Sequence, residues 1–120
     1  MEQKTILVAE DEIFNFYYIE ELLKAMNIKA LHAKNGLEAV ALIKSNPEIS
    51  LVLMDIRMPE MDGLMATKLI KELRPHLPVI AQTAYASRED RENARASGFD
   101  YYLTKPIMRD AFKEVIEKYL

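Results

Sequence analysis

Three acidic side chains in this chain have the types and positions needed to hold a metal ion. Glu10 and Asp11 follow the apolar residues 5–9, and Asp55 follows the apolar residues 51–54. Three carboxylates brought within several ångströms repel one another unless they bind a cation or share protons. A few carboxylate ligands completed by water are typical of Mg²⁺, and Mn²⁺ suits the same octahedral geometry. The pattern therefore predicts a divalent metal site.

Two further polar side chains, those of Thr83 and Lys105, also lie at the ends of apolar segments. Lys105 comes after residues 101–104 and would neutralise the acids or an incoming phosphoryl group, while Thr83 ends residues 79–83 and offers a hydroxyl donor. A residue before proline is steered away from helix, and the bond from Lys105 to Pro106 is a candidate for the cis form. Taken alone, each is more simply an ordinary strand-end residue. Together with the acids they indicate phosphate chemistry.

Short apolar segments alternate with helical patterns along the chain, and these elements must position the site. The strand-like segments are residues 5–9, 29–33, 51–54, 79–83 and 101–104. Between them, apolar residues spaced three and four apart predict helix faces at Ile19, Leu22, Leu23 and Met26, at Val40 and Ile43, at Leu69, Ile70 and Leu73, and at Phe112, Val115, Ile116 and Tyr119.

A fifth, polar helix is predicted over residues 88–97, ending at Gly98. Five strands alternating with five helices predict a parallel sheet covered on both faces, which is a doubly wound α/β fold. Ligands of such sheets bind outside the carboxyl ends of the strands. The acids, the hydroxyl and the lysine are therefore expected to meet at one edge.

Composition excludes several other classes of protein. The 120 residues are half hydrophobic, have a net charge of −3 and contain no linker-like tract, so we expect one domain over 1–120 without direct nucleic-acid binding. The absence of cysteine removes disulfides and thiolate sites, and His32 and His76 make a weak zinc case. No apolar run approaches the roughly 20 residues that cross a bilayer. We expect a cytoplasmic protein whose domain does not insert into a membrane.

Two other functions on this fold fit less well. An aspartate-nucleophile phosphatase needs a second acid shortly after Asp55, where Arg57 stands. A flavin or nucleotide binder needs a phosphate loop rich in Gly, Ser or Thr, and the acids after residues 5–9 would repel a phosphate unless a metal ion lay between them. Glu12 is better explained as a solvated or helix-capping acid than as a ligand.

Four motifs in order resemble the receiver domains of two-component response regulators and hybrid sensor kinases over nearly the whole chain. They are ILVAED at residues 6–11, LMDIRMP at 53–59 with MDG at 61–63, TA at 83–84, and YLTKP at 102–106. The resemblance implies a flavodoxin-like fold with strand order 2-1-3-4-5. It also implies that Asp55 accepts a phosphoryl group from phosphohistidine. A degenerate receiver that binds partners without phosphorylation is disfavoured, because all the chemical positions are present.

The resemblance assigns a role to each site residue. Asp11 would bind Mg²⁺ directly, Glu10 through water, and Arg57 through its backbone carbonyl, while Glu10 replaces the commoner aspartate. Lys105 would pair with the phosphoryl oxygens. Thr83 would move onto them, and the rotamer of Tyr102 would respond. Phosphorylation would then switch the surface of the fourth helix, fifth strand and fifth helix, and a phosphorylation-dependent dimer is compatible with that.

Two features beyond the motifs lead to further expectations. Arg57 and Tyr85, two positions beyond Asp55 and Thr83, are bulky where attacking water would pass, so we expect slow autodephosphorylation. The first helix carries more apolar residues than one buried face can accommodate. Phe14 and Tyr18 are therefore either exposed or covered by neighbouring loops. If they are exposed, they suit docking of a histidine-bearing helical partner.

The expected partner is a histidine kinase or a histidine phosphotransfer protein. Residues 63–67, 82–85 and 105–107 look most like receivers attached to hybrid histidine kinases. We therefore favour a receiver excised from such a kinase, which would make it the cytoplasmic part of a membrane-bound sensor, over a single-domain regulator. Such a domain catalyses its own phosphorylation and dephosphorylation without being a turnover enzyme by itself.

Overall fold

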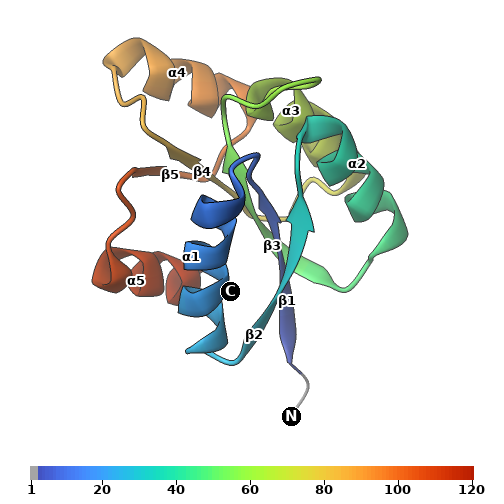
Figure 1. Cartoon of the computed structure of the whole chain (residues 1–120). Helices are drawn as coiled ribbons and strands as arrows, with labels where there is room; N and C mark the ends of the chain where they lie inside the picture. The colour runs from blue at the N-terminus through green and yellow to red at the C-terminus, as the bar shows by residue number, and fades with distance from the viewer. Residues whose placement is uncertain (1–2) are drawn as a thin grey trace.

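A five-stranded parallel sheet lies between two layers of helices (Figure 1). The computed structural model describes residues 3–120. Along the chain the elements are β1 (Lys4–Ala9), α1 (Ile13–Lys24), β2 (Ile28–Ala33), α2 (Gly36–Ser45), β3 (Ile49–Asp55), α3 (Gly63–Leu73), β4 (Val79–Thr83), α4 (Arg88–Ser97), β5 (Tyr101–Thr104) and α5 (Arg109–Tyr119). The strand order is β2-β1-β3-β4-β5. The doubly wound, flavodoxin-like fold expected from the sequence is confirmed.

Each face of the sheet has its own hydrophobic core. On one face α1 and α5 contribute Phe16, Ile19, Leu23, Phe112, Val115 and Ile116. On the other face α2, α3 and α4 contribute Ala39, Ile43, Ala66, Ile70 and Ala94. The central strands are buried on both faces, which is why they read as continuous apolar runs in the sequence. Their carboxyl ends are thereby fixed relative to one another.

The polar helix α4 has a capping motif at each end. Ser87 and Asp90 form a capping box at its start, and it ends at Gly98, whose φ of 106° is a left-handed conformation that glycine adopts readily. Only Ala94 and Ser97 of this helix are buried. The predicted residues 88–97 and the stop at Gly98 are confirmed. No helix in residues 3–120 is long and apolar enough to span a membrane.

One core position predicted from periodicity is wrong. Leu73 continues the helical spacing of Leu69 and Ile70, but its side chain is 46% exposed. It is the last residue of α3, and Leu77 from the following turn is buried in the core instead. Strand β3 is also longer than residues 51–54, since it begins at Ile49 and includes Asp55 as its last residue.

Candidate functional site

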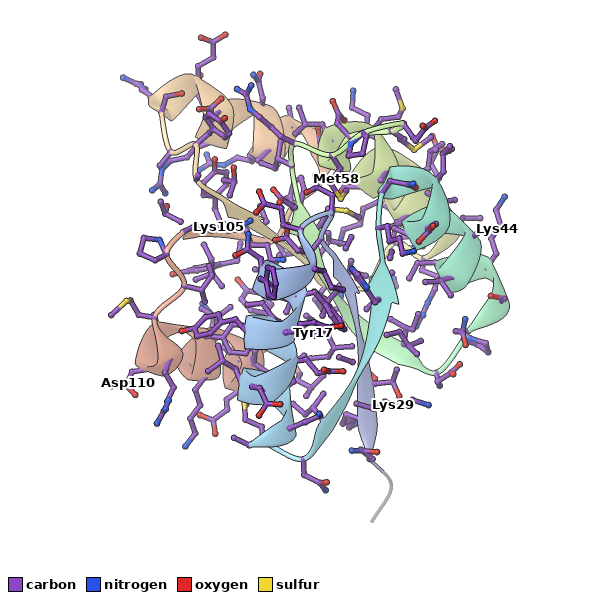
Figure 2. The ribbon with its side chains drawn as sticks, viewed as in Figure 1. Tyr17, Lys29, Lys44, Met58, Lys105 and Asp110 are labelled. Atoms are coloured by element: carbon purple, nitrogen blue, oxygen red, sulfur yellow. The ribbon has the colours of Figure 1, made fainter. Side chains whose placement is uncertain are left out.

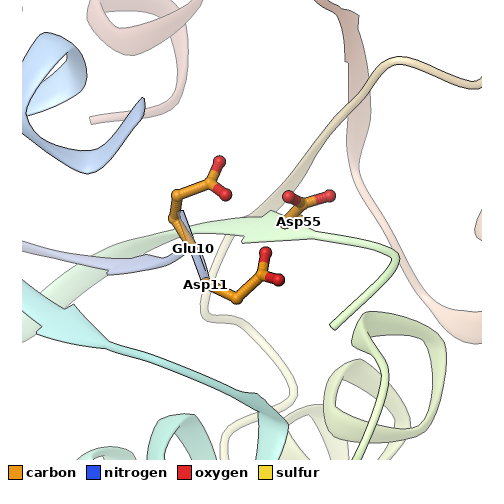
Figure 3. A group of neighbouring side chains, drawn as sticks. All are labelled: Glu10, Asp11 and Asp55. Carbon is orange, nitrogen blue, oxygen red and sulfur yellow. The ribbon is translucent and has the colours of Figure 1, made fainter. Parts of the chain in front are cut away.

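The three predicted acids meet at the carboxyl ends of β1 and β3. Glu10 and Asp11 directly follow β1, and β1 pairs with β3 so that Ala9 lies beside Met54, one residue before Asp55. One carboxylate oxygen from each acid lies within 4.8 Å of the others, and Figure 3 shows the three carboxyl groups gathered there. Glu10 and Asp55 are buried, while Asp11 is exposed. The spacing suits a single hard cation held between them.

The loop after β3 folds back tightly against the strand end that carries Asp55. The backbone N–H of Gly63 donates to the carbonyl of Ile56 at 2.7 Å. A Cβ atom on Gly63 would lie 2.1 Å from the carbonyl oxygen of Asp55. Any side chain at position 63 would therefore displace this loop, so glycine is needed here for the close approach of two backbones.

Lys105 forms an ion pair with each of the two buried acids. Its Nζ donates to Oε1 of Glu10 at 2.8 Å and to Oδ2 of Asp55 at 3.0 Å. The loop after β5 carries it, the bond to Pro106 is cis, and Figure 2 shows it near the start of α1. The predicted meeting of lysine and acids is confirmed.

Burial and charge shift the pKa values of the two groups that share this ion pair. Burial raises the pKa of Glu10 above its usual value and the negative charge of Asp55 adds to this, although the hydrogen bond from Lys105 opposes it. Burial alone would lower the pKa of Lys105, but its contacts with Glu10 and Asp55 raise it instead. The ammonium group therefore stays charged, and the three acids still outnumber the one cation.

Thr83 ends β4 at this same edge, where its carbonyl oxygen accepts a hydrogen bond from the backbone N–H of Lys105 at 2.8 Å, and it lines a cavity of about 270 Å³. Its Oγ1 accepts a hydrogen bond from the backbone N–H of Tyr85 at 3.1 Å. The guanidinium carbon of Arg57 lies 3.8 Å from the ring centroid of Tyr85, and the hydroxyl of Tyr102 donates to the Tyr85 carbonyl. Burial raises the pKa of that hydroxyl. The structure thus brings the predicted switch and tuning residues together around one loop.

The aromatic side chains at the start of α1 are exposed. Phe14 is 82% exposed, and Tyr17 and Tyr18 are each about half exposed. The alternative in which neighbouring loops cover them is wrong. The Tyr18 hydroxyl also donates to the carbonyl of Ile107 at 2.6 Å, which ties α1 to the loop that carries Lys105.

Comparison with known proteins agrees with this geometry. A family model described as the response regulator receiver domain matches residues 6–117. The chain belongs to the response regulator receiver family. As a receiver, it is a domain of two-component signalling. It is 40% identical to the polar-differentiation response regulator DivK of Brucella anthropi, over 98% of this chain and 96% of that protein.

Solved receiver structures share the fold closely. The receiver domain of a sensor histidine kinase from Pseudomonas aeruginosa, described with a magnesium ion coordinated in the active site cleft, is 31% identical with a TM-score of 0.90 and 98% of each chain covered. The receiver domain of a Saccharomyces cerevisiae response regulator, crystallised with a histidine phosphotransfer protein, is 29% identical with a TM-score of 0.90, covering 98% of this chain and 88% of that one.

Two residues at this receiver site were missed from the sequence. The ring of His32 stacks on Phe16 with centroids 3.9 Å apart, and its Nε2 lies 2.8 Å from the Glu10 carbonyl oxygen. A carbonyl oxygen only accepts, so Nε2 carries the hydrogen and holds the backbone of Glu10 in place. The place of His32 near the end of the strand beside residues 5–9 could have indicated this. The second residue, Gln82, lies next to Thr83 and is fully buried.

Proposed function

We propose that this receiver accepts a phosphoryl group on Asp55 from a phosphohistidine of a histidine kinase or a histidine phosphotransfer protein. The observation that carries the proposal is the Asp55 carboxylate at a strand end, in contact with Lys105 and within 4.8 Å of two further acids. A carboxylate with a fixed positive partner can act as a nucleophile toward an already energetic donor. The complex of a related receiver with a histidine phosphotransfer protein supports this class of donor.

The acid cluster fits Mg²⁺, which a receiver from Pseudomonas aeruginosa is described as binding. It would be held directly by the carboxylates of Asp11 and Asp55 and the backbone carbonyl of Arg57, and through water by Glu10. Mn²⁺ as a substitute stays a prediction. When bound, the ion supplies positive charge that stabilises the phosphoryl oxygens during transfer. Such an ion would also offset the mutual repulsion of the acids.

The side chains of this receiver divide the remaining work of the transfer. A carboxylate oxygen of Asp55 attacks phosphorus, the bond from phosphorus to the imidazole nitrogen breaks, and the electron pair leaves with the histidine. Lys105, already 3.0 Å from Asp55, pairs with the phosphoryl oxygens and lowers the charge that develops on them. The hydroxyl of Thr83 turns toward the same oxygens, and Tyr102 follows because both side chains hydrogen-bond the backbone of Tyr85.

The deciding experiment is phosphate incorporation from acetyl phosphate, a small donor that needs no partner protein. Wild-type protein with Mg²⁺ is expected to incorporate phosphate, and protein with excess EDTA or carrying Asp55→Asn is not. Incorporation that continues unchanged in EDTA would overturn the metal part of the proposal, and incorporation by the Asn variant would overturn the assignment of Asp55.

The loss of the phosphoryl group is expected to be slow because Arg57 and Tyr85 stack over the approach for water. Their contact of 3.8 Å places two bulky groups beside Thr83. The double variant Arg57→Ala and Tyr85→Ala should dephosphorylate faster by about tenfold, equivalent to about 1.4 kcal/mol of barrier. The measurement is the decay of the phosphoprotein after the donor is removed.

A matched control for that experiment is the exposed cation–aromatic pair of Lys118 on α5 and Tyr101 on β5. Replacing both of these by Ala should leave the decay rate unchanged, because neither residue lines the cavity beside Thr83. An unchanged or slower phosphate loss in the Arg57 and Tyr85 variant would contradict the proposed role of the stack.

The exposed aromatic residues of α1 are proposed to dock the phosphodonor protein. Exposed aromatic side chains often anchor such interfaces. Phe14→Gln together with Tyr18→Gln should slow transfer from a cognate histidine phosphotransfer protein by about tenfold or more, while phosphorylation by acetyl phosphate stays near the wild-type rate. The measurement is the rate of phosphate transfer from each donor.

The matched control for docking is Leu37→Gln, which changes an apolar residue on α2 that is about as exposed as Tyr18. It should leave both rates unchanged. Because Tyr18 also holds the Ile107 carbonyl, an equal loss with both donors would mean that the substitutions disturb the Lys105 loop, and the docking role would then be wrong.

We further propose that phosphorylation changes the surface formed by α4, β5 and α5. Tyr102 of β5 supports this, since its hydroxyl bonds the loop that follows Thr83 and Arg91 of α4 lies 5.0 Å from its ring centroid. A movement of Thr83 would therefore reach both elements. A phosphorylation-dependent dimer, attachment to a hybrid histidine kinase and a single receiver domain over 1–120 stay predictions.

A further inference from the structure

The two acids after β1 are joined by a single peptide group. Glu10 and Asp11 are consecutive residues, and Figure 3 shows their side chains leaving adjacent points of the backbone. The peptide between them is planar and includes the carbonyl group of Glu10 together with the Cα atoms of both residues. A contact that fixes this carbonyl oxygen therefore limits the directions in which both acidic side chains can point.

The side chain of His32 makes that contact. The pairing of β1 with β2 ends where the N–H of Glu10 donates to the carbonyl of Ala33 at 2.9 Å. The Glu10 carbonyl oxygen then lies 2.8 Å from Nε2 of His32, and within residues 3–120 no backbone N–H donates to it. The imidazole N–H thus holds the backbone at the point where the hydrogen bonds between the two strands stop.

The imidazole ring is itself held in one position. It stacks on the ring of Phe16 with centroids 3.9 Å apart and planes 13° apart, and Phe16 is buried beneath α1. Strand pairing places the backbone of His32 beside Val8 of β1. Because both the backbone and the ring are fixed, the Nε2–H has a defined direction toward Glu10.

The two acids differ in what else restrains them. The Glu10 carboxylate accepts hydrogen bonds from Nζ of Lys105 at 2.8 Å and from the backbone N–H of Glu12 at 3.2 Å. The Asp11 carboxylate is exposed and has no hydrogen bond or ion pair within residues 3–120. Its position therefore depends on the backbone that precedes it, which is the peptide that His32 holds.

We propose that His32 is a positioning residue for the divalent cation, and that its Nε2–H raises the affinity of the acid cluster for Mg²⁺ by holding the peptide between Glu10 and Asp11. This inference rests on the metal site of the proposed function. Removing a group that holds the ligands of a metal site commonly weakens metal binding by about ten- to a hundredfold. Since His32 acts through the backbone, we expect the lower end of that range.

Two variants of His32 separate the N–H donor from the ring. His32→Phe keeps a ring that can stack on Phe16 but has no N–H, whereas His32→Gln loses the ring and keeps an N–H donor the same number of bonds from the backbone. Mg²⁺ alone, without a phosphodonor, is titrated into each protein and followed through the backbone amide NMR signals of residues 54–57. The Phe variant should bind Mg²⁺ about tenfold more weakly than the wild type, and the Gln variant should stay within about threefold of it.

The matched control is His76→Phe, which makes the same change at the only other histidine. His76 is exposed in the turn that leads into β4, at the opposite edge of the sheet from the acids, so Mg²⁺ affinity should not change. A structural role of His32 alone would lower the affinity in step with the urea midpoint of unfolding. The Gln variant, which loses the stack, would then not retain its affinity.

The outcomes of this experiment are distinct. Equal Mg²⁺ affinity of the wild type and the Phe variant would overturn the inference, and so would a Gln variant as weak as the Phe variant. No Mg²⁺ binding by the wild type would overturn the metal site itself and this inference with it. A measurement on the wild type needs no variant: the ¹H–¹⁵N spectrum of the imidazole groups at neutral pH should show a hydrogen on Nε2 of His32. An Nε2 without hydrogen would also overturn the inference.

Discussion

Replacing Asp55 by Asn is expected to abolish phosphate incorporation from acetyl phosphate in the presence of Mg²⁺. The amide has the same shape as the carboxylate but no anionic oxygen to attack phosphorus, so the loss should be complete rather than partial. The measurement is intact-protein mass spectrometry after incubation with the donor. The variant should remain folded, because it removes one of three carboxylates that repel one another at this site.

The matched control for this variant lies in the loop after β3. Asp62→Asn makes the same chemical change, and the new side chain can still accept the hydrogen bond from the backbone N–H of Met65 that caps α3. Incorporation by this control should equal that of the wild type. If Asp55→Asn still gained one phosphate under these conditions, the phosphoacceptor would be another residue and the central proposal would be wrong.

Removing the charge of Lys105 is expected to give the largest change in stability. Lys105→Met leaves Glu10 and Asp55 buried without their cation, and breaking a buried ion pair on one side costs on the order of 3 kcal/mol. The free energy of unfolding, measured by urea denaturation at neutral pH without divalent ions, should fall by about this amount. Lys24→Met is the control, since among residues 3–120 Lys24 pairs with Glu20 and Glu21 on the exposed side of α1, and its loss should change stability by no more than about 0.5 kcal/mol.

The stability deficit of Lys105→Met is expected to depend on pH in a definite direction. Burial already raises the pKa of Glu10, and without Lys105 it should rise further. A carboxyl group whose pKa is higher in the folded than in the unfolded state favours folding when protonated, so the deficit of Lys105→Met should shrink as the pH falls from neutral toward 4.5. Mg²⁺ should shrink it as well. A deficit that stays constant with pH would show that lost packing, rather than charge, destabilises the variant.

Much of this fold was predictable from local patterns, and the exceptions have physical causes. The central strands are apolar because both of their faces are covered, and Gly98 ends α4 because it adopts a positive φ. The prediction that Leu73 is a core residue was wrong, because periodicity indicates which side of a helix a residue faces but not how far the core extends along that helix. The order of the strands came from family resemblance, since alternation alone does not say which strands are neighbours.

The site could be predicted where residues share one edge of the sheet. The meeting of Glu10, Asp11, Asp55 and Lys105 followed from strand ends alone, because parallel strands bring their carboxyl ends together. Gln82 gave no such signal, since a polar residue in an apolar strand has no obvious partner in the sequence. That its amide lacks a partner is a property of the packed structure and had to be observed there.

The burial of Glu10 sets stability against activity in this protein. Because its pKa is raised in the folded state, the charged form at neutral pH is less favourable there than in the unfolded chain. An amide at this position would relieve that penalty but would lose the negative charge offered to a metal ion. Stability and activity therefore favour different residues at one site, as is common where function needs a strained arrangement. A selection of variants for heat resistance alone would favour loss of the carboxylate, and would be a poor guide to which variants still signal.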